Sequence, residues 1–391
     1  MNKTKRTTIV FTAIILVAVI FALSFFILMK NPPVADENLP EENTTAESNA
    51  PTEIETGEPT TAYDLSGMTL KEKVAQMIMV SCHPSIDIDA ASRFGVGGIC
   101  LYAHSFESKT REQVVDMINS YQSSAKVSML VSVDEEGGTV VRISSNPNLR
   151  ATPFLSPSEI FAQGGMQAIT DDTNEKADLL LSLGVNVNLA PVCDVPLDSS
   201  NYIYDRCLSL NHDEVSEYSS TVVTAMKQKK IGSCLKHFPG YGGSVDTHQS
   251  MSYDNREFAD FVNGDFKPFE AGIRAGADCV LVSHNIVGCM DKDMPASLSK
   301  TVHDVLRNDL KFEGVIITDD LVMEGIAQFT DGDSAAVAAI KAGNDMIICN
   351  DFAGAVDAIV KAVNSGEIQQ SQIDESVVRI MKWKSDLNIL E

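Results

Sequence analysis

Residues 314–320 read Gly-Val-Ile-Ile-Thr-Asp-Asp, a short apolar run that ends in two carboxylic acids. Seven other short apolar runs recur at regular spacing along the chain. A continuous apolar run of this length is typical of a parallel β-strand that is buried on both faces. The eight predicted strands are Met77–Ser81, Gly98–Leu101, Met129–Val133, Val185–Leu189, Ser233–Leu235, Cys279–Val282, Val315–Ile317 and Met346–Cys349.

Segments between these runs have the spacing of amphipathic helices. Strands that alternate with helices indicate a parallel sheet, and eight of them fit a single α/β fold, the (β/α)8 TIM-type barrel. A doubly wound open sheet is the alternative, although no Gly-x-Gly-x-x-Gly follows the first strand. The predicted helices are Arg111–Ser124, Glu175–Leu183, Asp213–Lys229, Asp265–Ala275, Lys300–Asp309 and Ala335–Ala342.

Polar clusters follow five of the predicted strands. In a barrel the carboxyl ends of all strands open on one mouth, where active sites are built. A single Asp after a strand often caps the next helix, but five clusters at the same end favour a catalytic site. The clusters are 134–138 (Asp-Glu-Glu-Gly-Gly), 190–194 (Ala-Pro-Val-Cys-Asp), 236–240 (Lys-His-Phe-Pro-Gly), 283–285 (Ser-His-Asn) and 318–320 (Thr-Asp-Asp).

The amino-terminal end predicts a membrane anchor. Residues 1–8 form a basic end with Lys3, Lys5 and Arg6, and residues 9–29 carry no charge. As a helix, residues 9–29 reach about 31 Å, enough to cross a bilayer core. The positive-inside rule then predicts a single-pass cell-membrane protein with a cytoplasmic amino terminus and an extracellular folded domain. A cleaved signal peptide, which would leave a secreted protein, is the alternative.

Residues 30–62 predict a linker. Pro, Glu, Thr, Asn and Ala dominate this stretch, and its eight Asp and Glu face no Lys or Arg beyond Lys30. Such a composition cannot offset the entropy of ordering, so we expect a disordered and extended tether. The folded domain is expected to occupy residues 63–391.

The composition excludes some classes of protein. The 391 residues hold 30 Lys and Arg against 54 Asp and Glu, a net charge of −24. This balance excludes a nucleic-acid binder that works by neutralising phosphates, and nothing in the sequence implies a protein partner or a cofactor.

The eight Cys form no C-x-x-C pair and several lie in apolar runs, which favours buried free thiols over disulfides.

Several ordered motifs resemble one known family. Residues 236–248 (Lys-His-Phe-Pro-Gly-Tyr-Gly-Gly-Ser-Val-Asp-Thr-His) resemble the signature of bacterial glycoside hydrolase family 3 β-N-acetylglucosaminidases. Residues 314–323 resemble the nucleophile strand of that family. Residues 134–138 with Arg142, and Asp205-Arg206, resemble its sugar-binding segments. The resemblance spans about residues 65–385, essentially the whole folded part.

The resemblance implies a retaining mechanism that uses two groups of residues. It makes Asp319 the nucleophile and His248, paired with Asp246, the acid/base. On an extended segment Asp246 and His248 face the same way, so the carboxylate can orient the imidazole. The implied ligands of the sugar are Asp134, Arg142, Arg206, Lys236 and His237.

The acid/base loop departs from the family pattern. The family often reads Pro-Gly-His-Gly-Asp-Thr, then two residues, then Asp-Ser-His. Here Tyr241 replaces the His, Gly243-Ser244 replaces Asp-Thr, and one residue is missing. The Asp-x-His unit survives, so the mechanism is kept, while the leaving-group preference stays open.

The site residues also have simpler interpretations. Asp319 could cap the following helix, and its neighbour Asp320 is placed equally well. His residues near Asp at strand ends could form a metal site, but no H-x-H or H-E-x-x-H spacing occurs, so we expect no metal. The aromatic residues could provide a sugar-stacking face or simply pack. They are Tyr202, Tyr204, Phe238 and Tyr241.

The resemblance and the predicted anchor together imply an exo-β-N-acetylglucosaminidase. We expect a membrane-held hydrolase that removes terminal β-linked N-acetylglucosamine from cell-wall muropeptides or related glycans, and so takes part in peptidoglycan turnover. The enzymatic alternatives are a β-glucosidase or a glycoside phosphorylase of the same fold. A catalytically weakened surface module that binds glycans is the alternative from another class.

Overall fold

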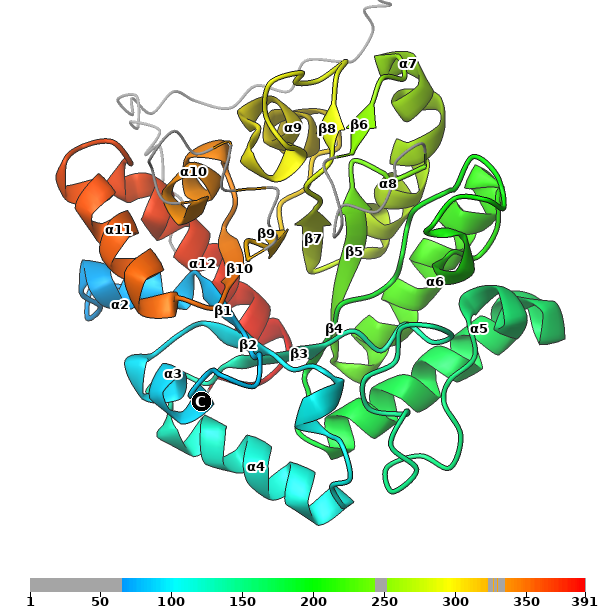
Figure 1. Cartoon of the computed structure of the whole chain (residues 1–391), viewed down its shortest axis with the longest axis horizontal. Coiled ribbons are helices and arrows are strands. Elements are labelled where there is room, and N and C mark those ends of the chain that lie inside the picture. The colour runs from blue at the N-terminus through cyan, green and yellow to red at the C-terminus, as the bar shows by residue number, and fades with distance from the viewer. Residues whose placement is uncertain (1–64, 243–251, 323–325, 327–328, 330–334, 391) are drawn as a thin grey trace, which may run out of the picture. The chain divides into compact units, whose positions relative to one another are not determined.

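Eight parallel strands close into a barrel in a computed structural model that describes residues 65–242, 252–322, 326, 329 and 335–390 (Figure 1). The first strand pairs with both the second and the last, so the predicted barrel is confirmed and the open doubly wound sheet is wrong. The barrel strands are β1 (Ile78–Ser81), β2 (Gly98–Cys100), β3 (Leu130–Val133), β4 (Val187–Asn188), β5 (Gly232–Phe238), β7 (Cys279–Val282), β9 (Val315–Asp320) and β10 (Met346–Cys349).

Burial on both faces explains why the strands are almost continuously apolar. Every residue of β1, β3, β7 and β10 is buried. Strands β5 and β9 run past their apolar segments to Phe238 and Asp320. The polar residues that the sequence places after these two strands therefore form their last residues.

Strands β5 and β9 each contain a β-bulge at the carboxyl end. Between Leu235 and Phe238, β5 has one residue more than the facing segment of β7. Between Ile317 and Asp320, β9 likewise has one residue more than the facing segment of β10. Side chains normally alternate between the two faces of a strand, and a bulge interrupts this alternation and redirects side chains.

The helices lie around the strands (Figure 1). Several begin with a capping box, in which a Thr or Ser and a Glu or Gln three residues later satisfy each other's backbone N–H groups. The helices are α2 (Leu70–Gln76), α3 (Ile88–Phe94), α4 (Arg111–Ser124), α5 (Pro157–Ser182), α6 (His212–Lys229), α7 (Phe258–Asp260), α8 (Phe266–Ala275), α9 (Lys300–Asp304), α10 (Ala335–Ala342), α11 (Phe352–Asn364) and α12 (Gln370–Asp386).

All six predicted helices occur, with changes at some ends. Helix α5 begins at Pro157, well before the predicted start, and its backbone breaks at Gly164 and Gly165. The predicted helix Lys300–Asp309 is α9 followed by a π-helical turn, Val305–Asp309. Short 3₁₀ turns occur at Ala103–Ser105, Tyr204–Arg206 and Ala296–Leu298, and a second π turn at Phe261–Asp265. A separate two-stranded sheet pairs β6 (Tyr253–Asp254) with β8 (Ile286–Val287).

The predicted anchor and linker lie outside the described residues. Residues 1–8, 9–29 and 30–62 therefore keep their status as sequence predictions. Among the helices that the structure describes, none is long and apolar enough to cross a membrane.

The eight Cys are free thiols, and all except Cys289 are buried, which confirms the expectation from the sequence.

Candidate active site

A cavity of about 400 Å³ opens at the carboxyl end of the barrel, and we call it the mouth cavity. Six of the eight predicted site residues line it. They are Asp134, Arg142, Arg206, Lys236, His237 and Asp319. The other two, Asp246 and His248, lie outside the described residues. The structure therefore brings together residues that are nearly 190 positions apart in the sequence.

Lys236 lies at the centre of a buried ion network beside the mouth cavity. Its Nζ is 2.6 Å from Oδ1 of Asp134 and 2.5 Å from Oε1 of Glu136. Burial alone would lower the pKa of Lys236, but the two carboxylates outweigh it and raise that pKa. The ammonium group therefore stays charged and holds both acids in place.

Arg206 closes the network from the other side of Glu136. Its Nε and Nη2 donate to the two oxygens of the Glu136 carboxylate at 2.9 and 2.8 Å, a bidentate pair. Burial would raise the pKa of Glu136, yet Arg206 and Lys236 hold it well below its usual range. Asp134, Glu136, Lys236 and Arg206 together carry no net charge, which suits an uncharged ligand.

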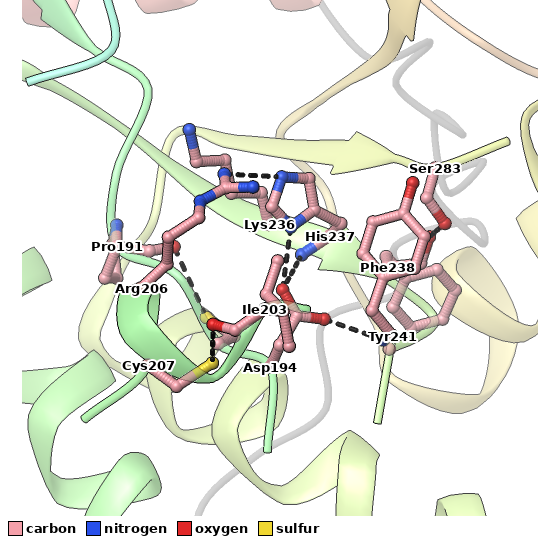
Figure 2. Close-up of polar contacts among 12 residues, drawn as sticks. Pro191, Asp194, Ile203, Arg206, Cys207, Lys236, His237, Phe238, Tyr241 and Ser283 are labelled. Carbon is pink, nitrogen blue, oxygen red and sulfur yellow. Dashed lines mark hydrogen bonds and ion pairs between the residues drawn. The ribbon is translucent and has the colours of Figure 1, made fainter. Parts of the chain in front are cut away.

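His237 is held by contacts to both of its ring nitrogens (Figure 2). Nη2 of Arg206 lies 3.2 Å from Nε2, and Oδ2 of Asp194 lies 2.7 Å from Nδ1. A guanidinium group can only donate, so Nε2 accepts and Nδ1 carries the proton that is donated to Asp194. The buried Asp194 thus fixes the tautomer of His237, and His237 in turn orients Arg206.

Arg142 is positioned by the acid that follows Asp134. The buried Glu135 accepts hydrogen bonds from the backbone N–H groups of Arg142 and Ile143, at 2.9 and 2.7 Å. Nη2 of Arg142 is 3.9 Å from Oδ2 of Asp134. Its Nε is buried and has no hydrogen-bond partner among the described residues. A buried donor of this kind is uncommon in proteins, and this one belongs to a residue that lines the mouth cavity.

The two adjacent acids of β9 have different surroundings. Oδ2 of Asp320 accepts from Oγ of Ser81 at 2.5 Å, and Nε2 of His83 lies 3.5 Å away. Oδ1 of Asp320 also accepts the backbone N–H of Val322 at 3.1 Å. Oδ1 of Asp319 accepts the backbone N–H of Asp320 at 2.9 Å. Asp320 thus links β9 to residues around β1.

The β-bulges explain how adjacent residues reach the same cavity. Lys236 and His237 are consecutive, as are Asp319 and Asp320, yet all four line the mouth cavity. In a regular strand, one member of each pair would point away from it. Both bulges fall at these pairs, where bulges in proteins commonly redirect functional side chains.

The aromatic residues near the mouth mostly pack. Phe238 and Tyr241 are buried, and Tyr202 contacts the ring of Tyr241 edge-on. Of the four aromatic candidates only Tyr204 is exposed. The backbone N–H of Tyr241, the residue that replaces the family His, donates to Asp194 at 2.8 Å, and the Tyr241 ring lies 5.1 Å from the His237 ring between centroids. No group of three or more metal-ligating side chains occurs in the described ranges.

Sequence reasoning missed three site residues. Glu136, Asp194 and Glu135 are all buried and hold Lys236, His237 and the Arg142 backbone respectively. The available signal was their position within polar clusters at strand ends. It could not distinguish an acid that faces a ligand from an acid that supports its neighbours.

The fold and the mouth cavity are those of a (β/α)8-barrel enzyme, and comparisons with known proteins define the family. The model of the glycosyl hydrolase family 3 N-terminal domain matches residues 69–383. A beta-hexosaminidase from Idiomarina loihiensis is 33% identical over 290 residues, which cover 71% of this chain and 83% of the relative. The chain belongs to glycosyl hydrolase family 3, as the motifs implied.

Solved structures show the same likeness. A family 3 β-N-acetylglucosaminidase from a Paenibacillus species has a TM-score of 0.77 and 28% identity, and the match covers 82% of this chain. This chain spans 63% of the Paenibacillus chain, which is less than two thirds of its length. A family 3 glycosyl hydrolase from Mycobacterium smegmatis has a TM-score of 0.73 and 27% identity, with 82% of this chain and 98% of that chain covered.

Proposed function

We propose that this chain is a retaining exo-β-N-acetylglucosaminidase, a glycoside hydrolase of the β-N-acetylhexosaminidase type. The observation that carries the proposal is the position of Asp319 in the bulged end of β9, beside a cavity lined by paired Lys, Arg and carboxylate groups. The beta-hexosaminidase relatives and the β-N-acetylglucosaminidase structure support this substrate class. They do not favour a β-glucosidase, a phosphorylase or a binding module without turnover.

The proposed reaction proceeds in two displacements. The Asp319 carboxylate attacks the anomeric carbon, while the imidazolium of His248 protonates the departing glycosidic oxygen. A covalent glycosyl-enzyme forms and the leaving sugar departs with the proton. His248 then takes a proton from water, the water oxygen attacks the anomeric carbon, and Asp319 leaves as a carboxylate. Asp246 would orient the imidazole and stabilise its charged form.

The remaining residues would hold the sugar. Asp134 accepts hydrogen bonds from sugar hydroxyls, and Arg142 and Lys236 donate to their oxygens. The partnerless Nε of Arg142 supplies one such donor. Arg206 would contact the sugar beside them. His237 would act largely by orienting Arg206, because both ring nitrogens of His237 already have protein partners.

We also propose that residues 9–29 anchor the chain in the cell membrane, with residues 30–62 as a tether and the barrel on the extracellular side. The support is the uncharged run behind a basic end. In this location the natural substrates would be cell-wall muropeptides or related glycans, and the role would be peptidoglycan turnover. Fractionation of producing cells tests the anchor, since an anchored chain stays with the membranes at high salt and a secreted one is found in the medium.

The activity is tested by the release of 4-nitrophenol from its β-N-acetylglucosaminide, with and without phosphate. We expect release by the full chain at a rate independent of phosphate. Asp319→Ala and His248→Ala should each reduce it strongly. An inactive wild type, or full activity in Asp319→Ala, contradicts the proposal. A rate that requires phosphate and yields a sugar 1-phosphate would instead identify a phosphorylase.

A further inference from the structure

A second cavity lies at the amino end of the barrel strands, the end opposite the mouth. Its volume is about 480 Å³, larger than the 400 Å³ of the mouth cavity. Segments that lead into β5, β7 and β9 form its walls together with the last helix, α12. Ligand pockets typically have volumes of about 300–1,000 Å³. We call this space the amino-end cavity.

Cationic side chains outnumber acidic ones in the lining of the amino-end cavity. Five Lys and Arg line it against three Asp and Glu, although the chain as a whole has a net charge of −24. The cations are Lys227, Lys230, Lys311, Arg379 and Lys382. The acids are Asp278, Glu313 and Asp386. A local excess of positive charge in so acidic a chain favours an anionic ligand.

Three of these cations are already engaged by the protein. Nη1 of Arg379 donates to the buried Asp345 at 3.1 Å. Nζ of Lys382 donates to the carboxylate of Asp386 at 2.5 Å, and Nζ of Lys230 donates to the backbone oxygen of Asp386 at 3.3 Å. These contacts fix part of the cavity wall.

The other two cations, Lys227 and Lys311, are exposed and form no hydrogen bond or ion pair within the described part of the chain. Lys227 acts electrostatically on one acid of the cavity, Asp278. Burial raises the pKa of Asp278, and the charge of Lys227 opposes this rise. However, Asp278 already accepts two hydrogen bonds from Ser233, from its N–H and Oγ, both at 2.9 Å. Two ammonium groups are therefore available to a ligand.

The deeper part of the amino-end cavity is apolar. Trp383 and Phe312 are each 3% exposed, and three aliphatic side chains lie with them. The aliphatic residues are Ile231, Ile273 and Leu387. An apolar floor below a cationic rim suits a ligand that joins an anionic group to an organic body, because aromatic rings pack well against such bodies.

We propose that the amino-end cavity binds an organic phosphate monoester, with its phosphate at the rim near Lys227 and Lys311 and its organic body over Trp383 and Phe312. Lysine is a common point-charge ligand of phosphate, whereas planar carboxylates are better matched by arginine. The single Arg of this cavity is already paired with Asp345. The proposal is independent of the activity assigned to the mouth cavity.

Isothermal titration calorimetry with glucose 6-phosphate tests the proposal. The full chain is kept in a non-ionic detergent and a phosphate-free buffer, with N-acetylglucosamine in excess to occupy the mouth cavity. We expect glucose 6-phosphate to bind with a Kd below about 1 mM. Inorganic phosphate should bind more weakly, and glucose should not bind. Absence of binding by glucose 6-phosphate, or equal binding of inorganic phosphate or glucose, would overturn the proposal.

Two double variants locate the site. Lys227→Gln/Lys311→Gln should weaken binding of glucose 6-phosphate by about tenfold or more, because two charge-assisted contacts are lost. Lys229→Gln/Lys361→Gln is the matched control, since it removes the same charge from helices α6 and α11 outside the cavity. It should bind as the wild type does. Equal weakening in both variants would show a general charge effect and contradict the assignment.

Discussion

Two ion networks lie at opposite ends of the barrel, and each pairs arginine with buried carboxylate groups. At the carboxyl end, Lys236 and Arg206 pair with Asp134 and Glu136 beside the mouth cavity. At the amino end, Asp345 comes directly before β10 and is 1% exposed. It accepts hydrogen bonds from four groups that lie on β9 and on the neighbouring helical segments. These groups are the Arg307 and Arg379 guanidinium groups, Oγ of Ser376 and the backbone N–H of Ile316.

The two networks differ in whether their polar groups all have hydrogen-bond partners in the described part of the chain. Asp345 is surrounded by donors, so its network joins β9, α12 and the turn that contains Arg307. At the mouth, the side chains of Asp134 and Arg142 are 17% and 28% exposed, and Nε of Arg142 has no partner in the described part of the chain. A closed network therefore stabilises the fold, whereas an incomplete one is suited to a ligand.

The largest expected effect is that of Asp319→Asn. This change removes the proposed nucleophile, so kcat should fall by about 10⁴-fold, which corresponds to about 5.5 kcal/mol. The free energy of unfolding should change little. Steady-state rates on the 4-nitrophenyl substrate and urea unfolding check both parts. The exposed Asp309→Asn is the control and should retain wild-type rates.

The comparison between the two networks is tested next by Asp345→Asn. Removing one partner of a buried ion pair should lower the free energy of unfolding by about 3–5 kcal/mol. Below the melting temperature, kcat/KM should stay within about twofold of wild type. The reason is that Asp345 directly precedes β10, at the amino end of the barrel, whereas the mouth residues lie at the carboxyl end. Urea unfolding and rates at 20 °C measure the two effects. A large loss of activity in a fully folded variant would contradict the distinction.

Lys236→Met tests the network at the mouth. It leaves Asp134 and Glu136 without their shared ammonium group, so kcat/KM should fall by about 100-fold, or about 2.7 kcal/mol. Lys236→Arg keeps the charge and should recover part of the loss. Unchanged kinetics in Lys236→Met, with lower stability alone, would place this network in the same class as that of Asp345.

The smallest effect concerns a buried amine that has one hydrogen-bond partner within the described ranges, the Lys384 side chain. Nζ of Lys384 donates to Oε1 of Gln76 at 2.7 Å, and burial lowers the pKa of Lys384 to about 7. Between pH 7 and the usual lysine pKa, the unfolded chain binds a proton that the folded chain does not, so stability rises with pH. From pH 7 to pH 9 the wild type should gain about 2 kcal/mol relative to Lys384→Met.

Urea unfolding at pH 7, 8 and 9 measures this gain. Lys382→Met, a change at an exposed position of the same helix, should keep the wild-type dependence on pH. A wild type and a Lys384→Met variant with parallel pH profiles would contradict the prediction.

Much of the fold could be predicted because the strands of a barrel are buried on both faces. Continuous apolar runs such as Cys279–Val282 and Met346–Cys349 coincide with the observed strands β7 and β10. Helix α5 was predicted too short because Gly164 and Gly165 interrupt its periodicity and the helix continues on both sides of them. The amphipathic helices α2, α3, α11 and α12 were not predicted at all.

The site could be predicted only in part. The order of motifs indicated Asp134, Lys236, His237 and Asp319, because each stands in a polar cluster at a strand end. Neither bulge leaves a sequence signal, since a bulge is defined by the register with the neighbouring strand. The supporting roles of buried acids such as Asp194 depend equally on contacts between distant segments.

The most direct measurement is the identification of the residue that becomes covalently attached to the sugar. The full chain is treated with a fluorinated N-acetylglucosaminyl donor that forms the glycosyl-enzyme faster than it is hydrolysed, and the digested protein is analysed by mass spectrometry. We expect one added N-acetylglucosaminyl derivative, located on Asp319. Labelling of Asp320 or another residue, or turnover without any covalent adduct, would contradict the proposed mechanism.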